Sequence, residues 1–198
     1  MTAILDADYW SKRFEMQDTP WDIGHVSTPL KEYIDQLTNR QQAILIPGCG
    51  NGYEAAYLLA NGFTNVTVVD ISAVLTQQLA ARFADYAGKQ LNIVTADFFS
   101  LQGQFDLVLE QTFFCALTPT LRKDYVAQMH RLLKAGGKLA GLLFNKIFDK
   151  PGPPFGGSME EYRALFGPLF HIKTMAPCHN SIAPRAGAEC FVIMEKAG

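Results

Sequence analysis

The chain has 198 residues, which is enough for one domain with a well-buried core but short for two. Apolar residues make up 48% of it and charged residues 18%, the balance of a folded globular protein. The formal charge of −2 argues against a nucleic-acid partner, which would require a basic face, and no apolar run is long enough to span a membrane.

Residues 1–41 precede the first core strand, and we expect them to form a helical lid over a ligand site rather than a second domain. A short helix over residues 7–16 carries Trp10, and turn-forming residues surround Trp21. Thr28, followed by proline, predicts the start of a second helix. The face of a tryptophan attracts a cation by about 0.5–2 kcal/mol, so both tryptophans suit a positively charged ligand. The alternative is that they only attach the lid to the sheet.

The stretch after the lid has the pattern of a nucleotide-binding turn. Residues 43–46 are continuously apolar, as in a strand buried on both faces, and Gly48, Gly50 and Gly52 follow at alternate positions. A helix is expected over residues 53–61. Glycine lets the backbone turn sharply and approach a ligand, and the start of a helix offers unpaired N–H groups. The turn therefore predicts a nucleotide-like ligand, with a tight turn that binds nothing as the alternative.

The next strand, residues 66–70, ends in Asp70, about 20 residues beyond the glycine turn. A carboxylate at this point of a doubly wound sheet binds ribose hydroxyls. NAD-binding sites carry G-x-G-x-x-G, whereas the third glycine here comes one residue early and Tyr53 takes its place. This spacing favours S-adenosylmethionine over NAD as the cofactor.

Two further strands bring polar residues to the same edge of the sheet. The third strand is followed by Asp97 and Phe98, where Asp97 would accept a hydrogen bond from the amine of an adenine or, alternatively, cap a turn. The fourth strand, residues 105–109, ends in Glu110 and Gln111. If the chain then crosses to the other half of the sheet, we expect these two side chains to point into the opening where ligands bind.

The second half of the chain continues the alternation of strands and helices and then departs from it. A long helix begins near Thr118 and ends at two glycines, and Ser158 begins a short helix. The Pro- and Gly-rich residues 149–157 form a loop suited to shape a substrate pocket. The strands expected after residue 137 span residues 138–144, 169–175 and 190–194.

These elements predict an α/β fold with a doubly wound, Rossmann-like, mostly parallel sheet of the class I methyltransferase type. The last two strands are joined outside the strand–helix rhythm and predict an antiparallel hairpin at the sheet edge. The whole chain, residues 1–198, is expected to form one domain, with the lid at 1–41 and the core at 42–198.

The four cysteines are scattered, and none forms a C-x-x-C pair: Cys49, Cys115, Cys178 and Cys190. We expect neither a zinc site nor a disulfide frame, and no acidic cluster suits magnesium. Cys49 is interpreted as a small filler of the glycine turn rather than a nucleophile. Free thiols, together with a first stretch unlike a signal peptide, predict a cytoplasmic location.

Several short motifs are specific when taken together, because the lid and the Gly-Pro-Pro loop among them are not shared with methyltransferases at large. They are Tyr9-Trp10, Thr19-Pro20-Trp21-Asp22-Ile23-Gly24, Ile46-Pro47-Gly48-Cys49-Gly50, Phe113-Phe114-Cys115-Ala116, Gly152-Pro153-Pro154-Phe155 and Pro184-Arg185. Together they resemble the S-adenosylmethionine-dependent thiol and thiopurine methyltransferases over nearly the whole chain, and especially the branch that methylates small thiols and halide-like anions.

The resemblance implies that Gly48 and Gly50 border the methionine part of the cofactor, that Asp70 binds its ribose and that Asp97 lies near its adenine. It also implies that both lid tryptophans close over the cofactor. The remaining expected cofactor contacts are Cys49, Ile71 and Phe98, which adjoin these residues in the sequence, and Glu110, which follows the fourth strand. One position departs from the family, because the thiopurine branch carries arginine, and the halide branch favours tyrosine, where this chain has Gln111. A thiopurine acceptor is therefore disfavoured.

These features predict an enzyme that transfers a methyl group to a small soft nucleophile by in-line displacement. A thiol of low pKa, thiocyanate or a halide-like anion is already nucleophilic at neutral pH, so no strong base is required. Arg185, in the loop before the last strand, is the candidate for attracting an anionic acceptor, unless it is simply a solvated loop residue. Gln111 is the candidate for orienting the acceptor by hydrogen bonding.

Other functions stay open at this point. An O- or N-methyltransferase of another small metabolite would need a base or a metal, and a module that binds the cofactor without turnover would need no acceptor pocket. An NAD-dependent dehydrogenase is disfavoured by Tyr53, and a nucleic-acid methyltransferase by the missing basic face. We expect a monomer or weak homo-oligomer that acts on a small-molecule acceptor, without a nucleic-acid or membrane partner.

Overall fold

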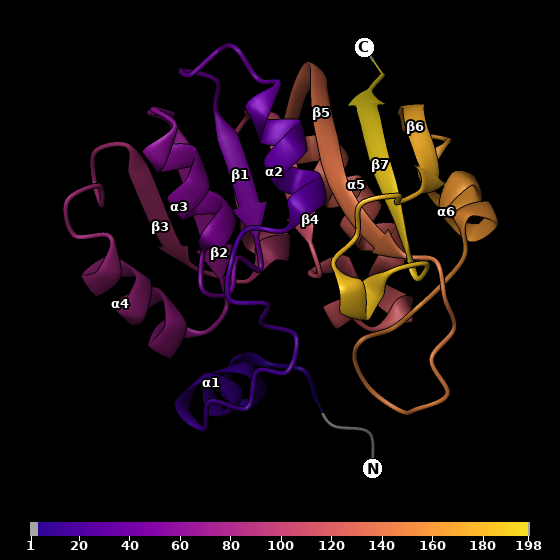
Figure 1. The fold of residues 1–198 in the computed structure, drawn as a ribbon, viewed down its shortest axis with the longest axis horizontal. Coiled ribbons are helices and arrows are strands. Elements are labelled where there is room, and N and C mark those ends of the chain that lie inside the picture. The colour runs from indigo at the N-terminus through magenta and orange to yellow at the C-terminus, as the bar shows by residue number, and fades with distance from the viewer. Residues whose placement is uncertain (1–3, 198) are drawn as a thin grey trace.

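The computed structural model describes residues 4–197 and contains a seven-stranded sheet in the order β3-β2-β1-β4-β5-β7-β6 (Figure 1). Strands β1 to β5 run parallel, and β7 is antiparallel to both of its neighbours. The order reverses between β1 and β4, so the predicted doubly wound sheet with a C-terminal antiparallel hairpin is confirmed.

The strands are β1 (Ile44–Pro47), β2 (Val66–Asp70), β3 (Leu91–Thr95), β4 (Phe105–Gln111), β5 (Leu133–Phe144), β6 (Phe170–Pro177) and β7 (Glu189–Lys196). The α-helices are α1 (Ala7–Glu15), α2 (Thr28–Asp35), α3 (Tyr53–Ala60), α4 (Ala73–Arg82), α5 (Arg122–Leu132) and α6 (Met159–Phe166). The short 3₁₀ helices that matter below are η1 (Phe98–Ser100), η2 (Phe114–Ala116) and η4 (Ala183–Arg185).

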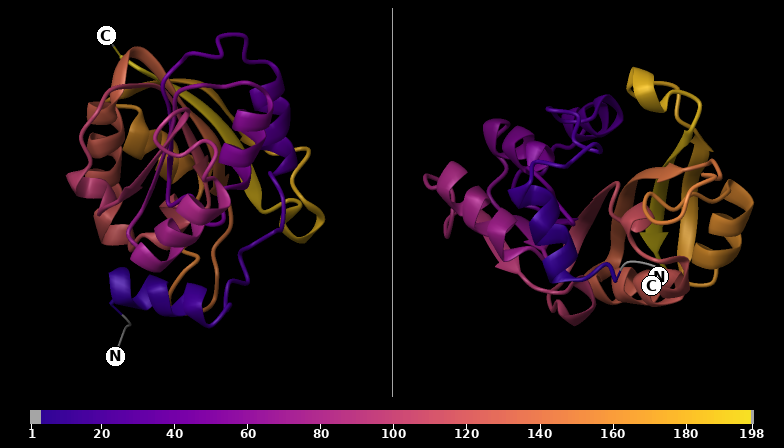
Figure 2. Two further views of the ribbon diagram at one scale, coloured as in Figure 1. Left: turned by 90° about the vertical axis from the view of Figure 1, so that its left-hand side faces the viewer. Right: turned by 90° about the horizontal axis from the view of Figure 1, so that it is seen from below.

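Helices cover both faces of the sheet, as the continuous apolar run of β1 requires (Figure 2). Ile44 and Ile46 face the core layer beneath α2, α3 and α4, whereas Leu45 between them faces the layer beneath α5 and α6. Each of these three side chains is at most 2% exposed. The alternation of one strand between two cores fixes its register, because a slip of one residue would exchange the faces.

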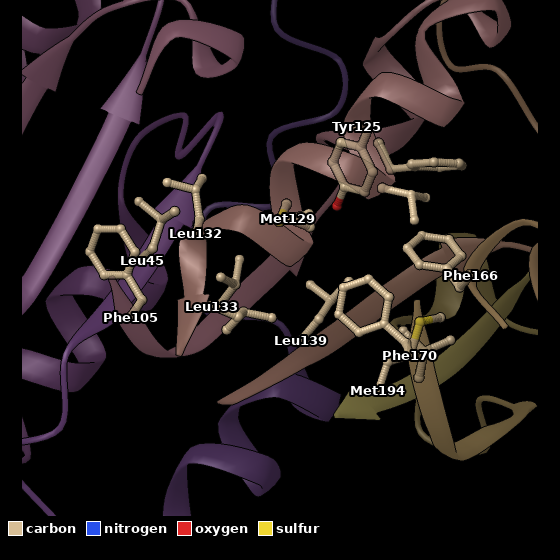
Figure 3. Close-up of a cluster of buried hydrophobic side chains, with 14 of the residues drawn as sticks. Leu45, Phe105, Tyr125, Met129, Leu132, Leu133, Leu139, Phe166, Phe170 and Met194 are labelled. Atoms are coloured by element: carbon tan, nitrogen blue, oxygen red, sulfur yellow. The ribbon is translucent and has the colours of Figure 1, made fainter. Parts of the chain in front are cut away.

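The core beneath α5 and α6 is dense in aromatic side chains (Figure 3). Tyr125 of α5 is fully buried and packs edge-to-face against Phe114, with ring centroids 4.9 Å apart. Phe166 of α6 and Phe170 of β6 continue the cluster at a centroid separation of 6.0 Å. This cluster holds the C-terminal hairpin against the parallel half of the sheet.

Two boundaries differ from the expectation. The long helix ends at Leu132, and β5 begins at Leu133 rather than at residue 138, because Leu133 pairs with Phe105 before a register shift in front of Lys138. The C-terminal hairpin forms, but its second strand β7 lies between β5 and β6, so only β6 is at the edge.

The expected lid divides into two parts. Helix α1 and the loop after it lie below the ends of the parallel strands in Figure 1, next to α4. Helix α2 instead packs on the sheet, and its Leu30 and Ile34 are fully buried in the core. We use "lid" below for residues 4–27 only, and "carboxyl edge" for the edge of the sheet at which β1 to β5 end.

The helices within residues 4–197 do not combine the length and apolar character needed to cross a membrane.

The close pairing of β4 and β5 yields a stability prediction at Gly141. A Cβ atom there would overlap the backbone carbonyl and Cβ of Glu110, so Gly141→Ala should lower the free energy of unfolding by roughly 1–3 kcal/mol or more. Urea unfolding measures this, with the exposed Lys138→Ala on the same strand as the control, expected within about 0.5 kcal/mol of the parent. Equal stability of Gly141→Ala and the parent would contradict the packing described.

Candidate active site

The glycine turn after β1 lies at the switch point of the sheet. Gly48, Gly50 and Gly52 have φ of +55°, +50° and +68°, which explains the glycines at alternate positions. The Gly48 N–H donates to the Val69 carbonyl at 2.8 Å, and a Cβ on Gly48 would overlap the ring of Phe113. A Cβ on Gly50 would have no neighbour within 4 Å, so the backbone there faces open space in which a ligand fits.

Asp70 ends β2 beside this turn, as predicted. Its Oδ1 accepts from the Ser72 N–H at 2.9 Å, and Ser72 in turn caps α4 through the Leu75 N–H. Burial raises the pKa of Asp70 to about 6, which leaves it mostly ionised at neutral pH. Ile71 next to it is half-buried. A carboxylate beside a glycine turn has the chemistry to hold ribose hydroxyls.

The residues after β3 have two different surroundings. Asp97 is exposed and accepts from the Phe99 N–H at 2.9 Å, so it caps η1. Capping was the alternative to a contact with the adenine amine. Phe98 is buried, and its ring lies 5.1 Å from that of Phe113. A contact of either residue with an adenine stays a prediction.

Glu110 does not point into the opening, contrary to expectation. Its side chain is fully buried, and its Oε1 accepts from the N–H groups of Phe113 and Phe114 at 2.7 and 2.9 Å. Its Oε2 accepts from the Tyr125 hydroxyl at 2.5 Å. The carboxylate turns inward because its three hydrogen-bond donors lie in the core. The side chain therefore stabilises the turn after β4, and only the backbone of Glu110 lies at the carboxyl edge.

The braced turn carries backbone strain. Thr112 has φ of +59°, a conformation that a β-branched residue rarely adopts. Its carbonyl accepts from the buried Cys115 thiol at 3.2 Å, and the bonds from Glu110 hold the next two residues. Strain of this kind persists only where the surroundings over-determine it and is common at functional sites.

Gln111, the last residue of β4, is half-buried and joined to the lid. Its Oε1 accepts from the Ser27 hydroxyl at 2.9 Å. Ser27 is 2% exposed, and its N–H donates to the carboxylate of Glu54 in the first turn of α3 at 3.3 Å. The end of β4, the lid and the helix after the glycine turn therefore meet at one serine.

Arg185 is not a solvated loop residue, because only 11% of its side chain is exposed. It donates to the Trp21 carbonyl at 2.8 Å and lies 3.5 Å from the carboxylate of Glu189. It also lines a cleft of ≈ 480 Å³ together with lid residues that include Asp22 and His25. The cation thus lies between the C-terminal hairpin and the lid, next to open space.

The lid tryptophans form an edge-to-face pair with ring centroids 5.6 Å apart. The guanidinium of Arg13 lies 5.1 Å from the Trp21 ring centroid, so a cation already occupies one face of that ring. Both tryptophans are half-buried. These ring contacts are made within the lid itself, and contact of Trp10 or Trp21 with the cofactor stays a prediction.

Asp22 is a lid residue whose role sequence reasoning missed. Its Oδ2 accepts from the Asn51 amide and, at 3.2 Å, from the Tyr53 hydroxyl, so it attaches the lid to the glycine turn. Tyr53 had only been noted for replacing a glycine, and its hydroxyl supplies the reason for a polar aromatic there. The signal in the sequence was Asp22 within the turn-forming stretch around Trp21.

The cysteines and the Pro- and Gly-rich loop have defined surroundings in the structure. The four cysteines are unpaired and buried, and burial raises the pKa of Cys49 well above its ordinary value, in keeping with a filler. The loop over residues 149–157 is anchored by Arg122, which donates to the Gly156 carbonyl at 2.7 Å, and by the Phe155 N–H on the Cys115 carbonyl at 2.7 Å. Within residues 4–197, no three His, Cys, Asp or Glu side chains are grouped as metal ligands.

The burial of Glu110 predicts a pH dependence of stability. Desolvation raises its pKa from 4.5 to about 7, so the folded protein holds a proton there that the unfolded chain has released. The stability contributed by this group is complete below pH 4.5 and is lost as the pH rises to about 7. The difference in unfolding free energy between the parent and Glu110→Gln should shrink by up to roughly 3 kcal/mol across this range.

Urea unfolding at a series of pH values measures that difference. Glu160→Gln, on the exposed side of α6, controls for the loss of one negative charge. A difference between the parent and Glu110→Gln that stays constant over the whole range would show that the carboxylate is not desolvated as described.

Residues 5–195 match the family described as Thiopurine S-methyltransferase (TPMT). The chain is 31% identical to "Probable thiol methyltransferase 2" of Arabidopsis thaliana, over 91% of this chain and 81% of that protein. It is 29% identical to "Thiocyanate methyltransferase 1" of Brassica oleracea over the same shares, and 25% identical to a thiopurine S-methyltransferase of Vibrio parahaemolyticus over 82% of each chain.

Solved structures show the same fold. The Burkholderia thailandensis 1,6-didemethyltoxoflavin-N1-methyltransferase, with S-adenosylhomocysteine bound, matches with a TM-score of 0.74 and 21% identity over 96% of this chain and 86% of that one. The magnesium protoporphyrin IX methyltransferase of Synechocystis, with S-adenosylmethionine bound, matches with a TM-score of 0.74 and 17% identity over 100% of both chains. The chain belongs to the thiopurine S-methyltransferase family and is an S-adenosylmethionine-dependent methyltransferase.

Proposed function

We propose that this enzyme methylates a small soft nucleophile, namely a thiol, thiocyanate or a halide-like anion, by in-line displacement. Bound S-adenosylmethionine supplies an electrophilic methyl group on a positively charged sulfur. The carbon–sulfur bond to that methyl breaks as the bond to the acceptor forms, and S-adenosylhomocysteine leaves. The observation that carries the proposal is the cation of Arg185, held beside an open cleft at the lid.

The residues that we assign to the cofactor lie at the carboxyl edge of the sheet. We assign the backbone of Gly48, Cys49 and Gly50 to the methionine part, because the turn faces open space at Gly50. Asp70 is assigned to the ribose, and the exposed carboxylate of Asp97 to the adenine amine. The expected side-chain contact at Glu110 is withdrawn, since its carboxylate is fully buried and bonded within the core, whereas Phe98 is kept as a neighbour of the adenine.

The acceptor side of the site supports a nucleophile that arrives already ionised. Thiocyanate carries its charge, and a thiol with a pKa near 8.5 or below is partly thiolate at neutral pH. The protein then has to attract and align the anion, and alignment alone supplies roughly 7–11 kcal/mol in well-oriented systems. Arg185 is assigned to attraction, and Gln111 to alignment.

The names of the relatives support the same acceptor class, since two of them are a probable thiol methyltransferase and a thiocyanate methyltransferase. Gln111 in place of arginine weighs against a thiopurine. Four unpaired cysteines support a reducing compartment such as the cytoplasm, and we propose a monomer or weak homo-oligomer.

An acceptor panel tests the proposal. With methyl-labelled cofactor, we expect label transfer to at least one of sulfide, thiocyanate, iodide or an aromatic thiol, and little to a thiopurine. Transfer to phenols or amines with none to any sulfur or halide acceptor would establish an O- or N-methyltransferase instead.

Substitution of Arg185 tests its assignment. Arg185→Ala should raise the KM for thiocyanate by roughly tenfold or more, because a charge-assisted contact is lost. Arg185→Lys keeps the charge but loses the forked geometry that reaches the Trp21 carbonyl. It should therefore recover part of the affinity for the acceptor. A change in the affinity for the cofactor would report loosening of the lid.

Steady-state kinetics with thiocyanate, together with calorimetry of S-adenosylhomocysteine, separate the two effects. Arg163→Ala, an exposed arginine of α6, is the matched control and should leave both unchanged. An acceptor KM that is the same in Arg185→Ala and the parent would remove Arg185 from the acceptor site.

A further inference from the structure

Three serines precede helices in this fold, and one of them does not cap its helix. Ser72 and Ser158 accept from the N–H groups of Leu75 and Glu161 at 3.3 and 3.2 Å, the usual bond of an N-cap serine. Ser27 precedes α2 and makes no such bond. Its hydroxyl is directed instead to the amide oxygen of Gln111, 84 positions further along the chain.

The diversion of this hydroxyl has a structural cost, because the first turn of α2 loses the bond that a serine normally provides. A serine that does not cap the helix it precedes indicates that another part of the structure requires its hydroxyl, commonly a functional site. The demand here comes from Gln111, which ends the central strand β4 at the carboxyl edge.

Ser27 is well suited to hold another residue. It is 2% exposed, and its backbone N–H is fixed by Glu54, itself 5% exposed. Because the hydroxyl donates its single proton to Gln111, the amide oxygen is the atom that faces Ser27. The Gln111 nitrogen, with its two N–H donors, is therefore turned to the other side of the amide.

We propose that Ser27 is a positioning residue that fixes the Gln111 amide as a hydrogen-bond donor to the methyl acceptor, and thereby gives the enzyme a preference for anionic acceptors. Two N–H donors stabilise an anion such as thiocyanate more than a neutral nucleophile. A free amide would rotate and offer its oxygen to the same place, where it would repel the anion. The proposal rests on the proposed function, whose acceptor it specifies further.

The central test is a double-mutant cycle on kcat/KM for thiocyanate. Ser27→Ala should lower kcat/KM by roughly tenfold, chiefly through the acceptor KM, with the affinity for S-adenosylhomocysteine unchanged. Gln111→Ala should lower it at least as much, and Ser27→Ala should have no further effect in the Gln111→Ala background. Ser27→Thr, which retains the hydroxyl, should recover most of the activity.

Gln111→Glu provides a second variant at a half-buried position that does not depend on replacing a buried serine. The new carboxylate still accepts from Ser27 but presents a negative oxygen in place of the N–H donors. The ratio of kcat/KM for thiocyanate to that for an aliphatic thiol, which is mostly protonated at pH 7, should therefore fall by roughly tenfold or more.

The outcomes distinguish this inference from the function on which it rests. A parent enzyme without activity on any sulfur or halide acceptor would defeat the proposed function. An active parent whose Ser27→Ala variant keeps its thiocyanate KM, or whose Ser27 and Gln111 effects add independently, would overturn the inference alone. An unchanged acceptor preference in Gln111→Glu would also overturn it.

Discussion

The buried carboxylate of Glu110 is the point on which the site depends. Glu110 is the penultimate residue of β4. It accepts from two backbone N–H groups of the following turn and from the hydroxyl of Tyr125 in α5. These bonds hold Phe113 against Gly48, so the shape of the glycine turn is set by a group in the core. The same bonds hold Thr112 in its strained conformation.

The acceptor side is assembled from parts of the chain that are far apart in sequence. Gln111 is held by Ser27, and Arg185 is held by the Trp21 carbonyl across 164 positions. Asp22 attaches the same lid to Asn51 and Tyr53 beside the glycine turn. Movement of the lid would therefore shift both candidate acceptor residues together.

Local patterns in the sequence predicted the elements that bury one or two apolar faces. The apolar run of β1, the glycines of its turn, Asp70 and the serine before α6 all follow from rules that act over a few residues. The same rules placed the start of β5 too late, because the pairing of Leu133 with Phe105 is a tertiary contact. Periodicity cannot report such a pairing.

The direction of polar side chains was harder to predict. Glu110 was expected in the opening because it ends a strand at the switch point, yet its three donors lie inward and come from residues up to 15 positions away. Ser27 was overlooked because the start of the helix was assigned to the next residue, Thr28, which precedes a proline. Arg185 lies in the loop before the last strand, as expected, but its burial depends on Glu189 and on the lid, which no local pattern reveals.

The central claim is that an anionic acceptor is bound between the lid, Gln111 and Arg185. The most direct measurement is a crystal structure of the enzyme with S-adenosylhomocysteine and iodide, in which anomalous scattering locates the halide. We expect an iodide within hydrogen-bonding distance of the Gln111 side-chain nitrogen and on the side of the site that Arg185 lines. Iodide bound at the carboxyl edge away from both residues, with the cofactor product in place, would contradict it.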